Sequence, residues 1–133
     1  MIPSSVTSIG NSAFQTCYSL ISVAIPNSIT SIETNVFRSC RSLISVTIPS
    51  SVTSIGERAF EYCYGLKTFD FRRSTSVPTL SNVNAFNYTG YWKEIVVPDE
   101  LYDTWITATN WNLTGYQIKE CIVKASESSL GPL

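Results

Sequence analysis

The stretch Ile48–Leu66, IPSSVTSIGERAFEYCYGL, is the third copy of a segment that occurs twice earlier in the chain. The first copy, IPSSVTSIGNSAFQTCYSL, begins at Ile2, and the second, IPNSITSIETNVFRSCRSL, begins at Ile25, so the copies start 23 residues apart. A repeat of this length is typical of a solenoid, in which each unit buries its apolar face by stacking on its neighbours. The 133 residues therefore predict one continuous array and not several globular domains.

Each copy also contains a short apolar pattern that predicts a β-strand. Leu43, Val46 and Ile48 follow an L-x-x-L-x-L spacing whose last three positions alternate between a buried and an exposed face. A proline follows, and it ends the strand because it cannot donate a ladder hydrogen bond. The spacing occurs four times, the last time with Trp92 at the leucine position after an irregular 26-residue repeat. We therefore expect four strands in one parallel sheet.

The interior of the solenoid is predicted from residues that recur at the same place in each copy. Val52 and Ile55 indicate a second short extended segment that faces inward. Neighbouring coils lie about 4.8 Å apart, so equivalent side chains should form stacked columns. A metal site in the cysteine column is not expected, because the chain has no histidine and stacked thiols do not converge. The columns are Phe14, Phe37 and Phe60, and Cys17, Cys40 and Cys63.

The composition excludes several classes of function. Only 14% of the residues are charged and the net charge is −1, which argues against binding to nucleic acid or an anionic membrane. No apolar run reaches the roughly 18–20 residues that span a bilayer, so membrane insertion is not expected. Without histidine, a nucleophile elbow, a P-loop or a dinucleotide motif, we expect no enzyme and no cofactor.

Beyond Pro98 the apolar period changes to that of a helix. Asp99 is a good N-cap, and the acidic residues that follow it suit the first helical turn, a reading that we prefer to a calcium site. Trp105 lies on the apolar face of this helix, which we expect to end near Thr109. Because an open coil end invites aggregation, we expect this aromatic-rich segment to cover the end of the stack.

Three parts of the chain follow from these patterns. Residues 1–98 form the solenoid, residues 99–120 a helical C-terminal cap and residues 121–133 a tail, of which SESSLGPL should be disordered or loosely docked. Cys121 is a core residue, a free thiol or half of an intermolecular bridge. A solenoid normally opens on an atypical capping repeat, whereas this chain opens on a full one. We therefore expect an exposed first coil that stacks on preceding repeats or on another copy.

The repeat I-P-x-S-V-T-S-I-G-x-x-A-F-x-x-C-x-x-L-x-x-V resembles the BspA-type leucine-rich repeat, with Glu33 in place of glycine and Val36 in place of alanine in the second copy. The C-terminal stretch VPDELYDTWITATNWN resembles the closing segment of such bacterial proteins, and the resemblance covers residues 2–120. It implies a β-rich α/β fold, a right-handed leucine-rich-repeat solenoid of about four coils with a short parallel sheet. It also implies a bacterial protein, often secreted or surface-attached, and some members act as adhesins.

Candidate binding residues lie where the copies differ. The outward positions of the concave sheet are small in the first two coils and become acidic later, at Asp70 and Glu94, with Thr68 beside them. A ridge after the cysteine column is richer in the residues that dominate interfaces. It is either a surface for a partner or a structural cover of the solenoid edge. We expect a protein- or glycan-binding module, or alternatively a structural segment. The ridge residues are Tyr18, Arg41, Tyr64 and Tyr91.

Overall fold

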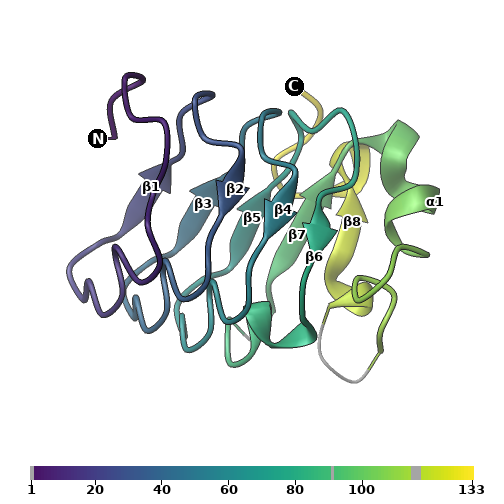
Figure 1. Ribbon diagram of the computed structural model, residues 1–133. Coiled ribbons are helices and arrows are strands. Elements are labelled where there is room, and N and C mark those ends of the chain that lie inside the picture. The colour runs from purple at the N-terminus through teal and green to yellow at the C-terminus, as the bar shows by residue number, and fades with distance from the viewer. Residues whose placement is uncertain (1, 91, 115–117) are drawn as a thin grey trace.

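The computed structural model describes residues 2–90, 92–114 and 118–133 and contains two parallel β-sheets. Successive repeats stack side by side from the N-terminal end to the C-terminal end of the molecule (Figure 1). The larger sheet has the strand order β1-β3-β5-β7-β8. Its strands are β1 (Ser22–Ala24), β3 (Ser45–Thr47), β5 (Thr68–Asp70), β7 (Glu94–Val97) and β8 (Ile122–Lys124).

The smaller sheet is built from the second extended segments of the second, third and fourth repeats; these segments were predicted, but their pairing into a sheet was not. It consists of β2 (Ser31–Ile32), β4 (Ser54–Ile55) and β6 (Thr79–Leu80) in that order. In each strand the second residue is buried and the first is more exposed, which is the alternation of a strand with one face in the core. Ile32 pairs with Ile55, and Ile55 with Leu80, so the interior positions of the repeats lie directly beside one another.

The register of the larger sheet confirms the predicted parallel strands but not their number. Val23 pairs with Val46 and Val46 with Phe69, at the 23-residue period, and Phe69 pairs with Ile95 after the 26-residue repeat. The prediction of four strands is wrong, because β8 adds a fifth strand in which Ile122 pairs with Ile95. Three residues are too few to produce a recognisable period, yet β8 completes the hydrogen bonding of the β7 edge.

The two predicted side-chain columns are present in the core. The rings of Phe14, Phe37, Phe60 and Phe86 stack nearly parallel, with centroids 5.5, 5.5 and 5.9 Å apart. The three cysteines of the column are free thiols, and Cys63 Sγ donates to the Phe37 carbonyl of the preceding repeat at 3.0 Å. A hydrogen bond to the neighbouring thiol and burial both raise the pKa of Cys63, so this thiol stays protonated. Both columns therefore hold adjacent repeats together.

The helical segment after Pro98 is shorter than the sequence predicts. A 3₁₀ turn, η2 (Asp99–Leu101), leads into α1 (Tyr102–Trp105), so the prediction of a helix to Thr109 is wrong. The helix ends where Thr107 Oγ1 bonds to the carbonyls of Asp103 and Thr104, a side-chain bond that competes with the helical ladder. The other 3₁₀ turns are η1 (Val83–Phe86), η3 (Lys119–Cys121) and η4 (Ala125–Glu127). Among the described residues, no helix has the length and apolarity to cross a membrane.

Asp99 also has a role other than the predicted one. Pro98 holds the N-cap position, and Asp99 is the first residue of the η2 turn. Instead, Asp99 Oδ1 accepts the backbone N–H of Ser126 at 3.0 Å, and hydrogen bonds from Ser126 lower the pKa of the carboxyl. The expectation of an N-cap is wrong because the turn begins at Asp99 itself, and the Asp99 carboxyl instead binds the C-terminal residues, which the sequence pattern does not place.

Trp92 does not occupy the buried leucine position. Its side chain is 86% exposed, whereas Leu66 at the predicted equivalent position is fully buried. The chain before β7 takes a different path, because the Gly90 N–H donates to the Leu66 carbonyl at 2.8 Å. A β-carbon on Gly90 would lie only 2.3 Å from that carbonyl oxygen, so the approach requires glycine. As a result Trp92 points outward, and the neighbouring Lys93 is buried.

Candidate binding surface

The loops that lead into the strands of the larger sheet lie on the lower side of the molecule in Figure 1. These loops carry large apolar side chains that are exposed. Each is at least half exposed, although most apolar side chains of the repeats are buried. These loops are direct neighbours, since the Ile44 N–H donates to the Ile21 carbonyl at 2.7 Å and the Lys67 N–H to the Ile44 carbonyl at 2.9 Å. We call the following residues the aromatic rim: Tyr18, Ile21, Arg41, Ile44, Tyr64 and Trp92.

A cation lies within the aromatic rim. The Arg41 guanidinium carbon is 4.9 Å from the centre of the Tyr18 ring, a cation–π contact. Among the ion pairs of the described residues, none involves Arg41 or the neighbouring Lys67. The rim, together with the adjacent Lys67, therefore combines exposed apolar area with two cations that have no carboxylate partner in the described part of the chain.

A second aromatic cluster lies beside the rim, and contacts within the chain hold its side chains in place. The Tyr62 and Tyr88 rings stack 5.2 Å apart at an interplanar angle of 6°, and the Arg38 guanidinium lies 5.3 Å from the centre of the Tyr62 ring. Arg38 Nε also donates to Glu61 Oε1 at 2.8 Å. Tyr62 and Tyr88 have φ values of 61° and 58°, in the left-handed region. The turn itself requires this conformation, because Ser39 adopts it in the preceding repeat.

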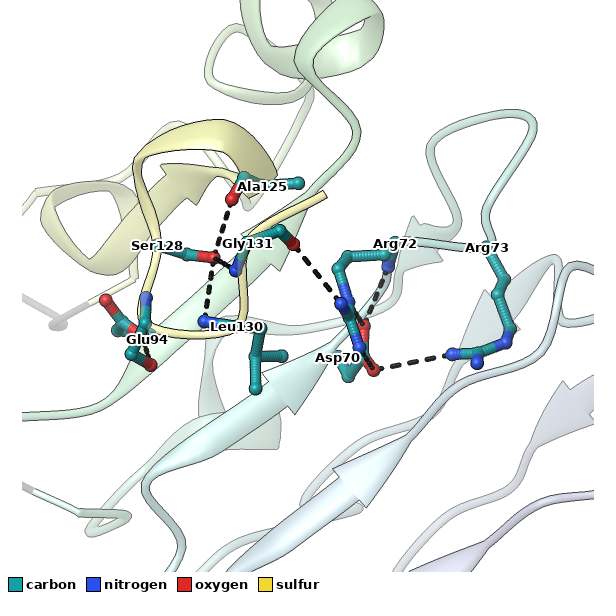
Figure 2. Close-up of polar contacts among 9 residues, drawn as sticks. Asp70, Arg72, Arg73, Glu94, Ala125, Ser128, Leu130 and Gly131 are labelled. Atoms are coloured by element: carbon teal, nitrogen blue, oxygen red, sulfur yellow. Dashed lines mark hydrogen bonds and ion pairs between the residues drawn. The ribbon is translucent and has the colours of Figure 1, made fainter. Parts of the chain in front are cut away.

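The acidic candidates on the concave sheet are engaged within the chain. Thr68 and Glu94 are paired residues on β5 and β7, and Thr68 is half-buried. Asp70 is buried and accepts two hydrogen bonds from the Arg72 guanidinium, each 2.9 Å long, while Arg73 approaches to 3.4 Å (Figure 2). Burial acts to raise the pKa of the Asp70 carboxyl, but the hydrogen bonds and charge of Arg72 outweigh it and lower the pKa.

The C-terminal residues cover this part of the concave face. Glu94 Oε1 accepts the Ser129 hydroxyl at 2.5 Å, and Arg72 Nη1 donates to the Gly131 carbonyl at 3.2 Å (Figure 2). Ser128 Oγ donates to the Ala125 carbonyl and accepts the N–H groups of Leu130 and Gly131, which closes the tail into a compact turn. The expectation of a disordered or loose tail is therefore wrong. Asp70, Arg72 and Glu94 anchor the tail.

The remaining predicted residues separate into two groups. Tyr18 and Tyr64 are 51% and 55% exposed and lie on the rim with Arg41. Tyr91 lies outside the described residues, and the 26-residue register between β5 and β7 aligns Gly90, not Tyr91, with Tyr64.

The sequence interpretation missed several exposed apolar residues, namely Ile21, Ile44, Tyr88 and Trp92. The period contained a signal for two of them. Ile21 and Ile44 occupy equivalent positions, each directly after the leucine of its repeat and outside the alternation that places side chains in the core. For Trp92 the same period gave the wrong answer, because the fourth repeat departs from the regular path.

The candidate residues that the structure describes lie mainly on contact surfaces. Among the described residues, no cluster of three or more His, Cys, Asp or Glu side chains is placed to hold a metal ion. Cys121 is a half-buried free thiol whose pKa is raised by burial.

Stacked repeats that each contribute one parallel strand, with leucine, isoleucine and phenylalanine facing inward, define a leucine-rich-repeat solenoid. The family model described as the BspA-type leucine-rich repeat region, of six copies, matches residues 1–107. The chain belongs to this family, whose repeats form scaffolds for binding. No curated protein and no solved structure matches the chain.

Proposed function

We propose that the chain is a non-catalytic binding module, secreted or attached to a bacterial surface, and that its aromatic rim binds a protein partner. The supporting observation is that six of the nine exposed large apolar side chains among the described residues lie on the rim or beside it: Tyr18, Ile21, Ile44, Tyr64, Tyr88 and Trp92. Tyrosine, tryptophan and arginine dominate the energetics of protein interfaces. Monomeric proteins rarely expose such side chains together unless they bind something.

The composition of the rim favours a protein over a glycan. Sugars stack on flat, freely accessible aromatic faces, but Arg41 already lies over the Tyr18 ring. Ile21 and Ile44 add aliphatic area that suits apolar side chains. Because Arg41 and Lys67 have no carboxylate partner in the described part of the chain, a segment that combines acidic and apolar residues is the best complement.

A binding panel tests this function. The immobilised chain is presented to a set of extracellular-matrix proteins and, separately, to a glycan array. The triple variant Tyr18→Ala, Arg41→Ala and Tyr64→Ala should weaken protein binding by about a hundredfold or more, since each such anchor contributes on the order of 2 kcal/mol. Three exposed residues away from the rim provide a matched control that should bind normally: Asn27→Ala, Ser50→Ala and Leu113→Ala.

Two results would overturn the proposed function. Binding to glycans without binding to any protein of the panel would exclude the protein partner. Equal affinity of the triple variant and the control would exclude the rim as the binding surface.

We infer that the scaffold consists of four coils in residues 1–98 and that residues 99–120 close the stack. The buried rings of Trp105 and Trp111 support this inference, because both contact Phe71, at 5.1 and 5.7 Å between ring centres. Trp111 Nε1 also donates to the Pro78 carbonyl at 2.8 Å, which fixes its ring against the fourth coil. Large indoles suit this position because they bury much apolar area with few rotatable bonds.

A further inference from the structure

The C-terminal tail, residues 126–133, lies over the concave face without burying a side chain of its own. Every residue of this segment is exposed or half-buried. The side chains of its two leucines, Leu130 and Leu133, are 38% and 70% exposed, so neither of them docks into the core. Hydrophobic burial, which holds the repeats together, therefore contributes little to holding the tail in place.

Hydrogen bonds attach the tail instead, and water competes for them. Glu94 Oε1 accepts both the hydroxyl and the N–H of Ser129, at 2.5 and 3.3 Å, and both bonds are exposed. Arg72 Nη1 donates to the Gly131 carbonyl at 3.2 Å in a part-buried position. Segments with few buried contacts and exposed hydrogen bonds open at a small fraction of the free energy that unfolds the whole protein. The tail therefore undocks while the solenoid stays folded.

The side chains beneath the tail are fixed by the solenoid and do not depend on the tail. Arg72 Nε and Nη2 each donate to one carboxylate oxygen of Asp70 at 2.9 Å, which leaves Nη1 for the tail (Figure 2). Asp70 belongs to β5 and Glu94 to β7, and these two strands pair directly. A carboxylate that grips a guanidinium from two sides also fixes the direction of the remaining donor. With its tail undocked, the concave face therefore presents a preorganised donor and acceptor.

The docked tail shows which kind of segment fits these two groups. Glu94 binds the N–H and hydroxyl of Ser129, and Arg72 binds the carbonyl two residues further on. Ser128 Oγ accepts two N–H groups of the same turn, and Gly131 has a φ of 74°, which glycine adopts without strain. A segment with the pattern Ser-Ser-x-Gly makes the same contacts from another chain, because most of them use the backbone and the two hydroxyls.

We propose that the C-terminal tail is a displaceable cover of a peptide-binding site on the concave face, and that a protein segment with the Ser-Ser-x-Gly pattern takes its place. The tail competes with such a partner from within the same chain, so the fraction of molecules with an undocked tail sets the apparent affinity. The site shares no residue with the aromatic rim and does not rest on the function proposed for the rim.

NMR titration of the full chain tests the proposal, with a synthetic peptide of residues 125–133, ASESSLGPL, as the probe. The variant Ser128→Ala/Gly131→Val removes the turn contacts and places a β-branched residue at a positive φ, so its own tail should undock. The peptide should shift the amide signals of Asp70, Arg72 and Glu94 and bind this variant about tenfold or more tighter than the parent. Adding Glu94→Ala to the variant should weaken binding about tenfold or more.

A control peptide, ASEAALVPL, keeps the acidic residue but loses both serines and the glycine, and it should not bind. Equal affinity of the parent and the tail variant for the probe peptide excludes the tail as a cover. A tail variant that does not bind the probe peptide excludes a site for this segment. Unchanged binding after Glu94→Ala, binding of the control peptide, or shifts confined to the aromatic rim exclude the assigned contacts. The dispersed amide spectrum of each variant confirms that the solenoid is folded before its affinity is interpreted.

Discussion

Replacing Phe60 with alanine tests whether the ring column carries the stability of the solenoid. Phe60 is fully buried, stacks on Phe37 at 5.5 Å and on Phe86 at 5.9 Å, and meets the edge of Phe69 at 5.2 Å. Truncating a buried phenylalanine costs about 3–5 kcal/mol, and each aromatic pair contributes about 0.5–1.5 kcal/mol beyond its buried area. With three ring partners and no exposure, Phe60→Ala should cost about 4–5 kcal/mol, a large part of the roughly 5–15 kcal/mol that stabilises a typical domain.

The same substitution in the first repeat is the matched control. Phe14 is half-buried and has one stacking partner, Phe37, so Phe14→Ala should cost about 1–2 kcal/mol. Urea unfolding followed by far-UV circular dichroism gives the free energy of unfolding. Equal costs for the two variants would refute the reasoning, because burial would then not depend on a neighbour on each side.

Three further predictions concern other positions. Gly56→Ala should destabilise the fold by about 1–3 kcal/mol, because the added β-carbon would lie 2.8 Å from the Thr34 backbone nitrogen. The control Gly10→Ala, in the first repeat, adds a β-carbon that meets nothing within 4 Å and should be neutral in the same urea assay. Equal effects of the two substitutions would contradict this prediction. The pKa of Asp70 is lowered in the folded state, so its ionised carboxylate stabilises the fold at neutral pH, and this stabilisation is lost as the pH falls below about 4. The Asp70→Asn variant should therefore be less stable than the parent at pH 7, and its stability should depend less on acid pH. Parallel pH profiles of unfolding for parent and variant would contradict it. Lys93 is buried, and desolvation lowers its pKa, so its charged form destabilises the fold. Lys93→Met should therefore raise the free energy of unfolding by about 1 kcal/mol. A thermal midpoint below that of the parent would contradict this prediction.

The parts of the fold that repeat were predictable from the sequence. An inward position must suit the same neighbours in every coil, so Phe37 and Cys40 have counterparts 23 residues before and after them. Register then follows directly, because a one-residue slip would turn every side chain of a strand to the other face. The pairing of Val23 with Val46 confirms this prediction.

The parts that occur once were not predictable in this way. β8 is three residues long, and the anchors of the tail, such as Arg72 with Gly131, join residues 59 positions apart. No local pattern encodes a contact of that separation. Trp92 was misplaced for a related reason, since the close approach of Gly90 to the preceding coil depends on backbone packing and not on hydrophobic spacing. The acidic concave candidates looked like a free surface because the C-terminal tail that reaches over them had no sequence signal of its own.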